Sequence, residues 1–305
     1  MNGPAEILLS DANHNAFPGY TNLADDTKMI IYRKATAHSS TDGVIELLAG
    51  PTVIYDDDTL DVRDPSITLL SNGDLIISFF KWDGEDAKSC YTIKSDDDGA
   101  TWSAPVEITN AFTAWSAISS PIIELANGDL VAAVYGRDIG DTRDSAVTVI
   151  SNDAGATWGS EAEIDPVELN TDFQEPNILL LSNGDILALL RTTSNEIYRS
   201  VSTDSGATWS YPVVCFPGSG SPRISRTTSD IVVCVYRSIA NSNAVVRASL
   251  DNGQNWSAET LLDDDGNSMT YGAMQELDTG NVKIVYGMET YSNPSVLRSL
   301  ELTIE

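Results

Sequence analysis

The stretch SDDDGATW at residues 95–102 recurs three more times along the chain, and this recurrence decides the fold. The other copies are SNDAGATW (151–158), STDSGATW (202–209) and SLDNGQNW (249–256), whose tryptophans are 56, 51 and 47 residues apart. The Asp of each copy can accept backbone N–H groups, the Gly can adopt a positive φ, and the Trp can pack on a neighbouring strand. We interpret these segments as structural turns rather than as functional sites.

A second pattern alternates with the turns. It reads DPSITLLSNGDLIISFF (64–80), SPIIELANGDLVAAVY (120–135), EPNILLLSNGDILALL (175–190), SPRISRTTSDIVVCVY (221–236) and YGAMQELDTGNVKIVY (271–286), with a weaker copy FPGYTNLADDTKMIIY (17–32). In each copy two runs of β-forming residues flank Asn-Gly or a similar turn, which is typical of a β-hairpin. The chain therefore contains six hairpins.

Six units of about 50 residues, each with four expected strands, predict a β-propeller. A third strand precedes each Ser-x-Asp turn and a fourth follows it, and no long amphipathic helix competes. The last unit ends with its third strand, SVLRSLELTI (295–304), so we expect AEILLS (5–10) to complete the sixth blade. The prediction is an all-β, six-bladed propeller of four-stranded blades, closed by the N-terminal strand, with residues 1–305 as one domain.

Charge excludes several functions. The chain carries 45 acidic and 17 basic residues, a net charge of −28, which repels nucleic acid and anionic membranes. No apolar run approaches the roughly 20 residues of a membrane helix, and no signal peptide is recognisable at the N-terminus. We therefore expect neither a nucleic acid nor a membrane as partner.

Cysteine and metal patterns are weak. Cys90, Cys215 and Cys234 are too few for a disulfide framework, so free thiols are expected, with a Cys215–Cys234 pair as the alternative. No CxxC or HExxH pattern predicts zinc, and we expect no metal or cofactor. The acidic segments YDDDTLD (55–61) and LLDDDGN (261–267) are interpreted as solvated loops, with calcium binding as the alternative.

Propeller geometry brings basic residues to one mouth. The first strand of every blade starts at this face and the second strand ends there, so Arg33, Lys81, Arg137, Arg191, Arg237 and Gly287 should surround it. Arg63 precedes a first strand and joins them. A cationic mouth on an acidic protein attracts and orients an anion. The alternative is that these cations pair with nearby acidic residues.

Further chemistry gathers at the same face. The first strands begin with Asp64, Glu175 and Tyr271, and the segment YRKATAHSSTDG (32–43) adds His38 and Asp42. We therefore expect carboxylates, a phenol, a histidine and several cations to share one mouth.

These features together resemble the sialidase superfamily, whose Asp boxes match the Ser-x-Asp-x-Gly-x-Thr-Trp turns over nearly the whole chain. QEPNILLLSNGDILALLRTT (174–193) resembles the stretch with the glutamate partner and a triad arginine, which implies Glu175 and Arg191. TYGAMQELDTGNVKIVYG (270–287) resembles the stretch with the nucleophile, which implies Tyr271. HSSTDGVIELL (38–48) resembles the loop with the acid/base aspartate, which implies Asp42.

The implied roles are chemically sensible. A tyrosine hydroxyl, with a pKa near 10, is a poor nucleophile until a base such as Glu175 accepts its proton. A tyrosine suits an anomeric carbon that bears a carboxylate, because a carboxylate nucleophile would be repelled. Asp42 would protonate the leaving oxygen and later activate water. Asp64 is a further candidate acid, so a carboxylate-pair mechanism with Glu175 stays open.

The chain departs from the family at two of three arginines. Sialidases hold the substrate carboxylate with three, but NAFPGY (15–20) has none, and Asn241 stands at the third position. Only Arg191 is matched, so Arg33, Arg63 and Arg237 are expected to rebuild the anion site. The segments YRKATAHSSTDG and DVRDPS resemble a less characterised group of sialidase-like bacterial proteins, for which sialic acid, another ulosonic acid such as Kdo, or a uronic acid is the expected sugar.

The sequence therefore predicts an exo-glycosidase that removes a terminal acidic sugar from a glycan or oligosaccharide. Catalytic roles are expected for Tyr271, Glu175, Asp42 and Asp64. Substrate binding is expected from Arg33, His38, Arg63, Lys81, Arg137, Arg191 and Arg237. The alternatives are a lyase on uronate chains, in which His38 or Tyr271 removes a proton, and a non-catalytic glycan-binding propeller. A secreted or periplasmic location would suit such a substrate.

Overall fold

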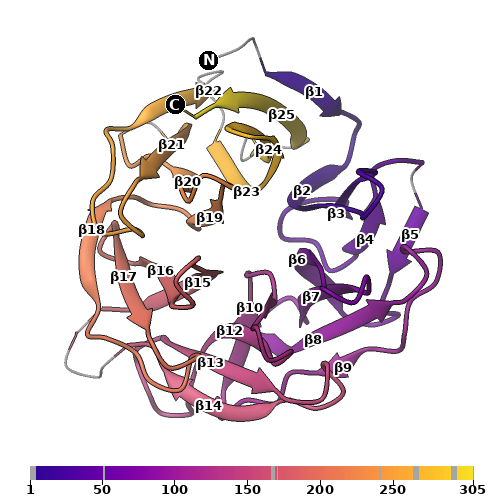
Figure 1. The fold of residues 1–305 in the computed structure, drawn as a ribbon. Helices are drawn as coiled ribbons and strands as arrows, with labels where there is room; N and C mark the ends of the chain where they lie inside the picture. Colours follow the sequence, from indigo (N-terminus) through magenta and orange to yellow (C-terminus); the bar gives the residue numbers. More distant parts are fainter. Residues whose placement is uncertain are drawn as a thin grey trace.

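The protein is built from six β-sheets arranged around a central axis (Figure 1). The computed structural model describes residues 5–50, 52–165, 169, 171–240, 242–263, 268–289 and 294–304. These residues form strands, turns and irregular segments and no helix, so none of them belongs to a helix that is long and apolar enough to cross a membrane. The predicted all-β propeller is confirmed.

Each sheet is one blade, and its first strand lies next to the axis. Blade 1 consists of β2 (His14–Asn22), β3 (Lys28–Ala35), β4 (Val44–Leu47) and β5 (Thr52–Tyr55). Blade 2 consists of β6 (Asp61–Leu69), β7 (Leu75–Trp82), β8 (Ala87–Ser95) and β9 (Val106–Glu107). Blade 3 has a first strand in two pieces, β10 (Trp115–Ile118) and β11 (Ile123–Glu124), followed by β12 (Leu130–Arg137), β13 (Ser145–Ser151) and β14 (Gly159–Glu163).

The remaining blades repeat the order. Blade 4 consists of β15 (Phe173–Leu180), β16 (Ile186–Thr192), β17 (Glu196–Ser202) and β18 (Val213–Pro217). Blade 5 consists of β19 (Arg223–Arg226), β20 (Val232–Arg237), β21 (Ala244–Ser249) and β22 (Thr260–Asp263). Blade 6 consists of β23 (Ser268–Asp278), β24 (Asn281–Glu289), β25 (Val296–Thr303) and, as its outer strand, β1 (Glu6–Leu9).

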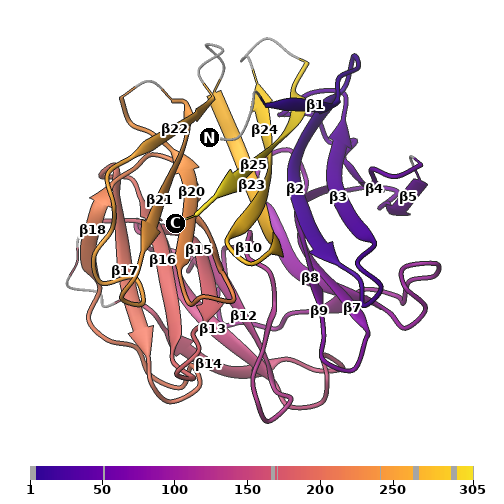
Figure 2. The same ribbon diagram turned by 45° about the horizontal axis from the view of Figure 1, so that its top comes forward.

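The two ends of the chain close the ring, as predicted. Strand β1 pairs antiparallel with β25, so the sixth blade combines both ends of the chain (Figure 2). At the seam with blade 1, His14 forms a parallel bridge with Ser295, whose hydroxyl donates a 2.8 Å hydrogen bond to the Asn15 carbonyl. Closure joins the last blade to the first and gives the terminal strand β1 a partner in β25.

The four Ser-x-Asp turns join the third and fourth strands of blades 2 to 5 at the face opposite the mouth. In the first turn, the Gly99 N–H donates to the Ser95 hydroxyl and the Thr101 N–H donates to the Asp97 carboxylate, each over 2.8 Å. The other three turns repeat both bonds, with Asn255 in the place of the threonine in the last. The turns are therefore structural, and they fix one face of the propeller.

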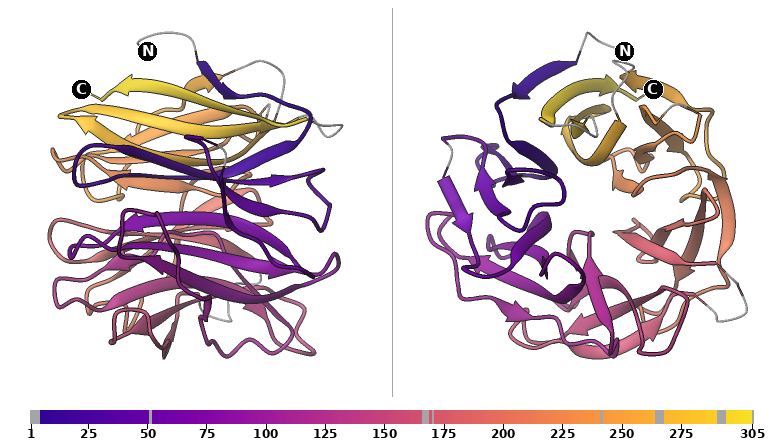
Figure 3. Two further views of the ribbon diagram at one scale, coloured as in Figure 1. Left: turned by 90° about the vertical axis from the view of Figure 1, so that its right-hand side faces the viewer. Right: turned by 180° about the vertical axis from the view of Figure 1, so that it is seen from behind.

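The hydrophobic core lies between neighbouring blades rather than in one central mass. Figure 3 shows these blades as successive sheets around the axis. Alternate residues of each strand face the sheets on either side, which produces clusters between blades 1 and 2, blades 4 and 5, and blades 5 and 6, and one that spans blades 2 to 4. Because apolar side chains pack in the spaces between blades, the polar and charged residues of the first strands can lie at the axis.

The free thiols expected from the sequence are confirmed: Cys90, Cys215 and Cys234 form no disulfide. Cys90 and Cys234 are buried, whereas Cys215 is partly buried.

Candidate functional site

One residue from each blade lies at the same position of the repeat, at or just before the first strand. The six are Phe17, Asp64, Ser120, Glu175, Ser221 and Tyr271. The first strands of blades 1, 2, 4 and 6 shift register around this position, and in blade 3 the strand is interrupted there. A bulge re-aims the side chain at this point and ends the regular ladder. The repeat therefore delivers one side chain per blade to the mouth.

The backbone at these bulges is strained. Phe17, Asp64 and Glu175 have φ angles of 54°, 51° and 45°, a region that non-glycine residues rarely adopt. Each of the three is followed by a proline. Such strain costs on the order of 1–3 kcal/mol per residue and is concentrated at functional sites.

Tyr271, Glu175 and Arg191 form a hydrogen-bonded group at the axis. The Tyr271 hydroxyl donates to Glu175 Oε1 over 2.5 Å, and Arg191 Nη1 donates to the same oxygen over 2.8 Å. Burial, followed by the nearby Asp64 and Glu175 carboxylates, raises the pKa of Tyr271 well above its usual value. The attraction of Glu175 raises the pKa of Arg191. The phenol is therefore protonated at rest, with a proton acceptor in contact.

Asp64 is the second carboxylate at the axis. It is buried, and its Oδ2 accepts a 2.7 Å hydrogen bond from the Ser119 hydroxyl of blade 3. Burial raises the pKa of Asp64, and the negative charge of Glu175 acts in the same direction. Asp64 thus favours its protonated form more than a solvent-exposed aspartate does.

Arg223 is a buried cation at the axis that the sequence analysis missed. Its guanidinium carbon lies 5.0 Å from the centre of the Tyr271 ring. Burial lowers the pKa of Arg223, while Asp64, Tyr271 and Glu175 oppose that effect. Among the described residues, no hydrogen-bond partner meets its Nε atom. The signal was present in the repeats, because the equivalent residue of the other blades is uncharged: Gly19, Ser66, Ile122, Asn177 and Ala273.

Arg33 and Arg63 share the buried carboxylate of Asp61. Arg33 is fully buried and binds both oxygens of Asp61, at 2.8 and 2.9 Å from its Nη2. Arg63 also binds Asp61, and its Nη2 donates to the His38 carbonyl over 2.6 Å. Its guanidinium carbon lies 4.1 Å from the centre of the Trp82 ring. Arg33 is therefore a buried residue that holds Asp61 in place, whereas Arg63 is partly exposed and contacts the loop that contains His38.

Three of the expected cations contact other parts of the protein instead of the group at the axis. Two pair with nearby acidic residues, as the alternative interpretation of the sequence predicted, and the third binds a backbone carbonyl. Lys81 pairs with Asp57 over 2.7 Å, and Arg137 pairs with Asp144 over 2.5 Å. Arg237 donates to the Ser219 carbonyl over 2.8 Å. Within the described residues, the structure does not bring these three cations into contact with Tyr271 or Glu175.

The loop between β3 and β4 carries Asp42 and His38. The Asp42 carboxylate accepts from the Thr36 N–H over 3.0 Å and from the hydroxyls of Thr36 and Ser40. Burial opposes ionisation of Asp42, but these hydrogen bonds lower its pKa to about 2. Asp42 is thus bound within its own loop. Asn241, at the position of the missing third arginine, lies outside the described residues.

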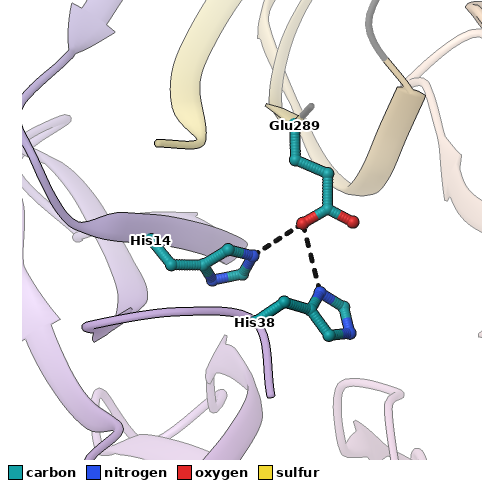
Figure 4. Close-up of side chains that lie close together, drawn as sticks. All are labelled: His14, His38 and Glu289. Carbon is teal, nitrogen blue, oxygen red and sulfur yellow. Dashed lines mark hydrogen bonds and ion pairs between the residues drawn. The ribbon is translucent and has the colours of Figure 1, made fainter. Parts of the chain in front are cut away.

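His38 instead reaches across the seam to Glu289 at the end of β24 (Figure 4). Glu289 also binds His14, the first residue of β2, over 2.7 Å. Neither Glu289 nor His14 was predicted. Glu289 lies only two residues beyond Gly287, where the second strand of blade 6 was expected to reach the mouth.

Two cavities lie along the axis. The larger, about 700 Å³, is lined by the inner strands below the bulges and by only two charged residues, Glu124 and Arg223. The smaller, about 300 Å³, is lined by the charged residues Arg63, Glu85, Asp86, Glu175 and Arg191 together with the aromatic residues Phe80, Trp82, Trp115 and Tyr135. We place the site at the smaller cavity, because Glu175 and Arg191 of the hydrogen-bonded group line it and one sugar ring fits such a volume.

Comparison with known proteins points to one family. Residues 63–284 match the family of BNR repeat-like domains. A curated sialidase from Bacteroides fragilis is 27% identical over 215 residues, which cover 63% of this chain and 38% of that protein. The chain therefore spans less than half the length of this relative.

Solved structures share the fold. A protein of unknown function from Dyadobacter fermentans superposes with a TM-score of 0.84 at 20% identity, covering 98% of this chain and 97% of that one. A Trypanosoma rangeli sialidase in complex with sialic acid superposes with a TM-score of 0.72 at 15% identity, covering 97% of this chain and 56% of that one. At these identities the likeness is one of fold.

Proposed function

Because the chain belongs to the BNR repeat-like domain family and has the propeller of the sialidases, we propose that it is a glycoside hydrolase that removes a terminal acidic sugar. One observation carries the proposal: a tyrosine, a glutamate and an arginine from three different strands meet at the axis, with Tyr271 hydrogen-bonded to Glu175 and Glu175 to Arg191. A core aromatic residue or a surface ion pair does not require this arrangement.

The chemistry of the group suits a substrate with a carboxylate on its anomeric carbon. Attack by a phenol avoids the repulsion between two carboxylates, and Glu175 is in contact to take the phenol proton as the bond to the anomeric carbon forms. The Arg223 guanidinium beneath the Tyr271 ring would stabilise the phenolate when the sugar later leaves it. The steps give a covalent intermediate and retention of configuration.

Cations are placed to hold the substrate carboxylate. Arg191 and Arg63 line the cavity from blades 4 and 2. Their present partners, Glu175 and Asp61, leave further guanidinium N–H groups for an anion, because an arginine has five donors. A ulosonic acid is the substrate class that fits best, with sialic acid and Kdo as the members to test.

The test is a screen of the purified protein against aryl glycosides of sialic acid, Kdo and uronic acids. Tyr271→Phe and Glu175→Gln are measured beside the wild type, with Glu107→Gln as a matched carboxylate control on outer strand β9. We expect one ulosonide to be hydrolysed, with loss of activity in the two site variants only.

Other outcomes would change the assignment. Hydrolysis that survives Tyr271→Phe would exclude the phenol as nucleophile. An unsaturated product that absorbs in the near ultraviolet, released from a uronate polymer, would identify a lyase. Binding of acidic glycans without any turnover would identify a binding propeller.

A further inference from the structure

The only two histidines of the chain meet one carboxylate at the seam between blades 1 and 6. Glu289 Oε2 lies 2.7 Å from His14 Nε2 and 3.1 Å from His38 Nδ1 (Figure 4). The two rings are edge to face, with centres 5.1 Å apart. Burial would raise the pKa of Glu289, but the hydrogen bonds from both histidines lower it to about 2. Glu289 is therefore an anion that accepts two N–H bonds.

The proton positions follow from Arg33. Its Nη1 lies 3.3 Å from His14 Nδ1, and a guanidinium can only donate. His14 Nδ1 must accept that bond, so the His14 proton is on Nε2 and is donated to Glu289. Arg33 cannot turn away easily, because both oxygens of the buried Asp61 hold it.

His38 is then left with a free nitrogen. Its Nδ1–H donates to Glu289, which turns Nε2 to the side of the ring away from the carboxylate (Figure 4). No described residue bonds to this Nε2. The His38 side chain is 49% exposed, whereas that of His14 is fully buried. A carboxylate that fixes one nitrogen of an exposed imidazole and leaves the other free is the arrangement of a general acid/base.

The position of His38 relative to the site supports this role. The buried ring of Phe17 contacts His38 on one side and Tyr271 on the other, with ring centres 5.7 and 4.7 Å away. The His38 carbonyl accepts a hydrogen bond from Arg63, which lines the cavity. His38 is thus linked through Phe17 to Tyr271 and through Arg63 to the lining of the cavity that contains Glu175.

We propose that His38 is the acid/base catalyst of the hydrolysis, and that Glu289 and His14 are positioning residues that fix its tautomer and orientation. The proposal rests on the glycosidase function above and replaces Asp42 in that role, since the Asp42 carboxylate is bound by Thr36 and Ser40. The imidazolium would donate its Nε2 proton to the glycosidic oxygen as the bond from that oxygen to the anomeric carbon breaks and Tyr271 bonds to the same carbon. In the second step His38 takes a proton from water, whose oxygen bonds to the carbon as Tyr271 departs and recovers its proton from Glu175.

The same cluster has the composition of a divalent metal site, since its three ligand atoms lie within 4.8 Å of one another. Arg33 argues against a metal. A histidine that binds metal through Nε2 carries its proton on Nδ1 and donates it to an acceptor. Here that nitrogen faces a guanidinium, which cannot accept. The hydrogen bonds pair all three of the would-be ligand atoms, His14 Nε2, His38 Nδ1 and Glu289 Oε2, with one another without an ion.

Several charges surround the imidazole. Glu289 faces it from β24, His14 from β2 and Arg63 from β6, with Arg33 of β3 behind His14 and Asp42 in the same loop. Glu289 is the only one of them in hydrogen-bond contact with the ring. Its removal should therefore disfavour the protonated imidazole, and the limb of the pH–rate profile that reports the acid should move to lower pH.

The first experiment reads the proton positions directly. With only two histidines, a long-range ¹H–¹⁵N spectrum of ¹⁵N-histidine-labelled protein resolves all four ring nitrogens. We expect His14 as the Nε2–H tautomer and His38 as the Nδ1–H tautomer at pH 8. In Glu289→Gln, His38 should shift toward the Nε2–H tautomer that free imidazole prefers. A change in both histidines on addition of one equivalent of Zn²⁺ would overturn the array in favour of a metal site.

The second experiment measures the dependence on the leaving group. His38→Gln should lower the rate of hydrolysis of an oligosaccharide by about 10²- to 10⁴-fold, but that of an aryl glycoside with an acidic phenol far less, because such a phenol needs no proton to leave. Azide should partly restore His38→Ala. Ser39→Ala, the exposed neighbour, is the control, and thermal melting checks that each variant folds. Glu289→Gln should move the pH profile, which a purely structural role would not do.

The outcomes separate the two proposals. If the wild type cleaves no glycoside, the proposed function and the role of His38 both fail. If Tyr271→Phe abolishes cleavage while His38→Gln affects both leaving groups equally, only the His38 assignment fails. If Asp42→Asn shows the leaving-group dependence instead, the acid/base is Asp42.

Discussion

The Tyr271 hydroxyl donates a 2.5 Å hydrogen bond to the carboxylate of Glu175, although 96 residues separate the two in the sequence. Each sits at the bulge of a first strand, and blade 5 lies between their blades in the ring. The propeller axis brings them together, and Arg191 holds the same carboxylate oxygen from a second direction.

Glu175→Gln should lower kcat by at least about 10²-fold and leave the fold intact, because an amide keeps the shape but cannot take the phenol proton. Steady-state kinetics on the ulosonide identified by the screen and thermal melting would check this. An unchanged kcat would show that the contact with Tyr271 is only structural.

Substitutions of Arg191 and Arg223 should affect different kinetic constants. Arg191→Met should act mainly on KM, because Arg191 lines the cavity in which we propose that the substrate carboxylate binds. Arg223→Met should act mainly on kcat, by about 10- to 100-fold, because Arg223 lies against the Tyr271 ring and stabilises the departing phenolate. Equal effects of both variants on KM would contradict the division.

The Arg33–Asp61 pair should be costly to break and less costly to replace. Both side chains are fully buried, so Arg33→Met leaves a buried carboxylate with Arg63 as its remaining cation and should reduce the free energy of unfolding by about 3–5 kcal/mol. The double variant Arg33→Met/Asp61→Leu should recover part of that loss. Denaturant titration measures both, and a double variant less stable than Arg33→Met alone would refute this account.

Acid should destabilise the seam between blades 1 and 6. The pKa of Glu289 is lowered from 4.5 to about 2 in the folded protein. Its carboxylate therefore contributes stability that is fully present above pH 4.5 and is lost as the pH falls toward 2. Between pH 5 and pH 3 the wild type should lose about 2 kcal/mol more than Glu289→Gln, which has no group to protonate. Parallel loss in the two proteins would show that Glu289 is not the group responsible.

The Ser-x-Asp turns should matter for stability and not for activity. Ser95 is buried and accepts the Gly99 N–H, so Ser95→Ala leaves that donor unpaired and should cost about 1–2 kcal/mol. Asp96→Ala, at the exposed neighbouring position, is the matched control and should change stability little. Chemical unfolding of both, with hydrolysis rates measured beside it, tests the interpretation; a loss of activity at full stability would assign the turn a functional role.

The sequence by itself determined the architecture, because propeller blades are made of local hairpins whose turns and alternating strands repeat in the chain. The six hairpin copies predicted the number of blades, the spacing of the Trp turns predicted the length of each unit, and the unpaired AEILLS segment predicted the closure that β1 and β25 form. The same repeats brought Glu175, Asp64 and Tyr271 to one mouth, since equivalent positions of a ring face one axis.

Only the tertiary structure decided which side chains touch. Lys81, Arg137 and Arg33 were expected to face an anion, but each lies within reach of a carboxylate that repeat periodicity does not specify. Glu289 meets His14 across 275 residues, a contact that exists because the last blade closes against the first. Backbone pattern is local and repeats, whereas the pairing of long polar side chains depends on rotamers and on neighbours from other blades. The sequence therefore predicted which face of the propeller carries the site, but it did not predict which side chains donate and accept hydrogen bonds there.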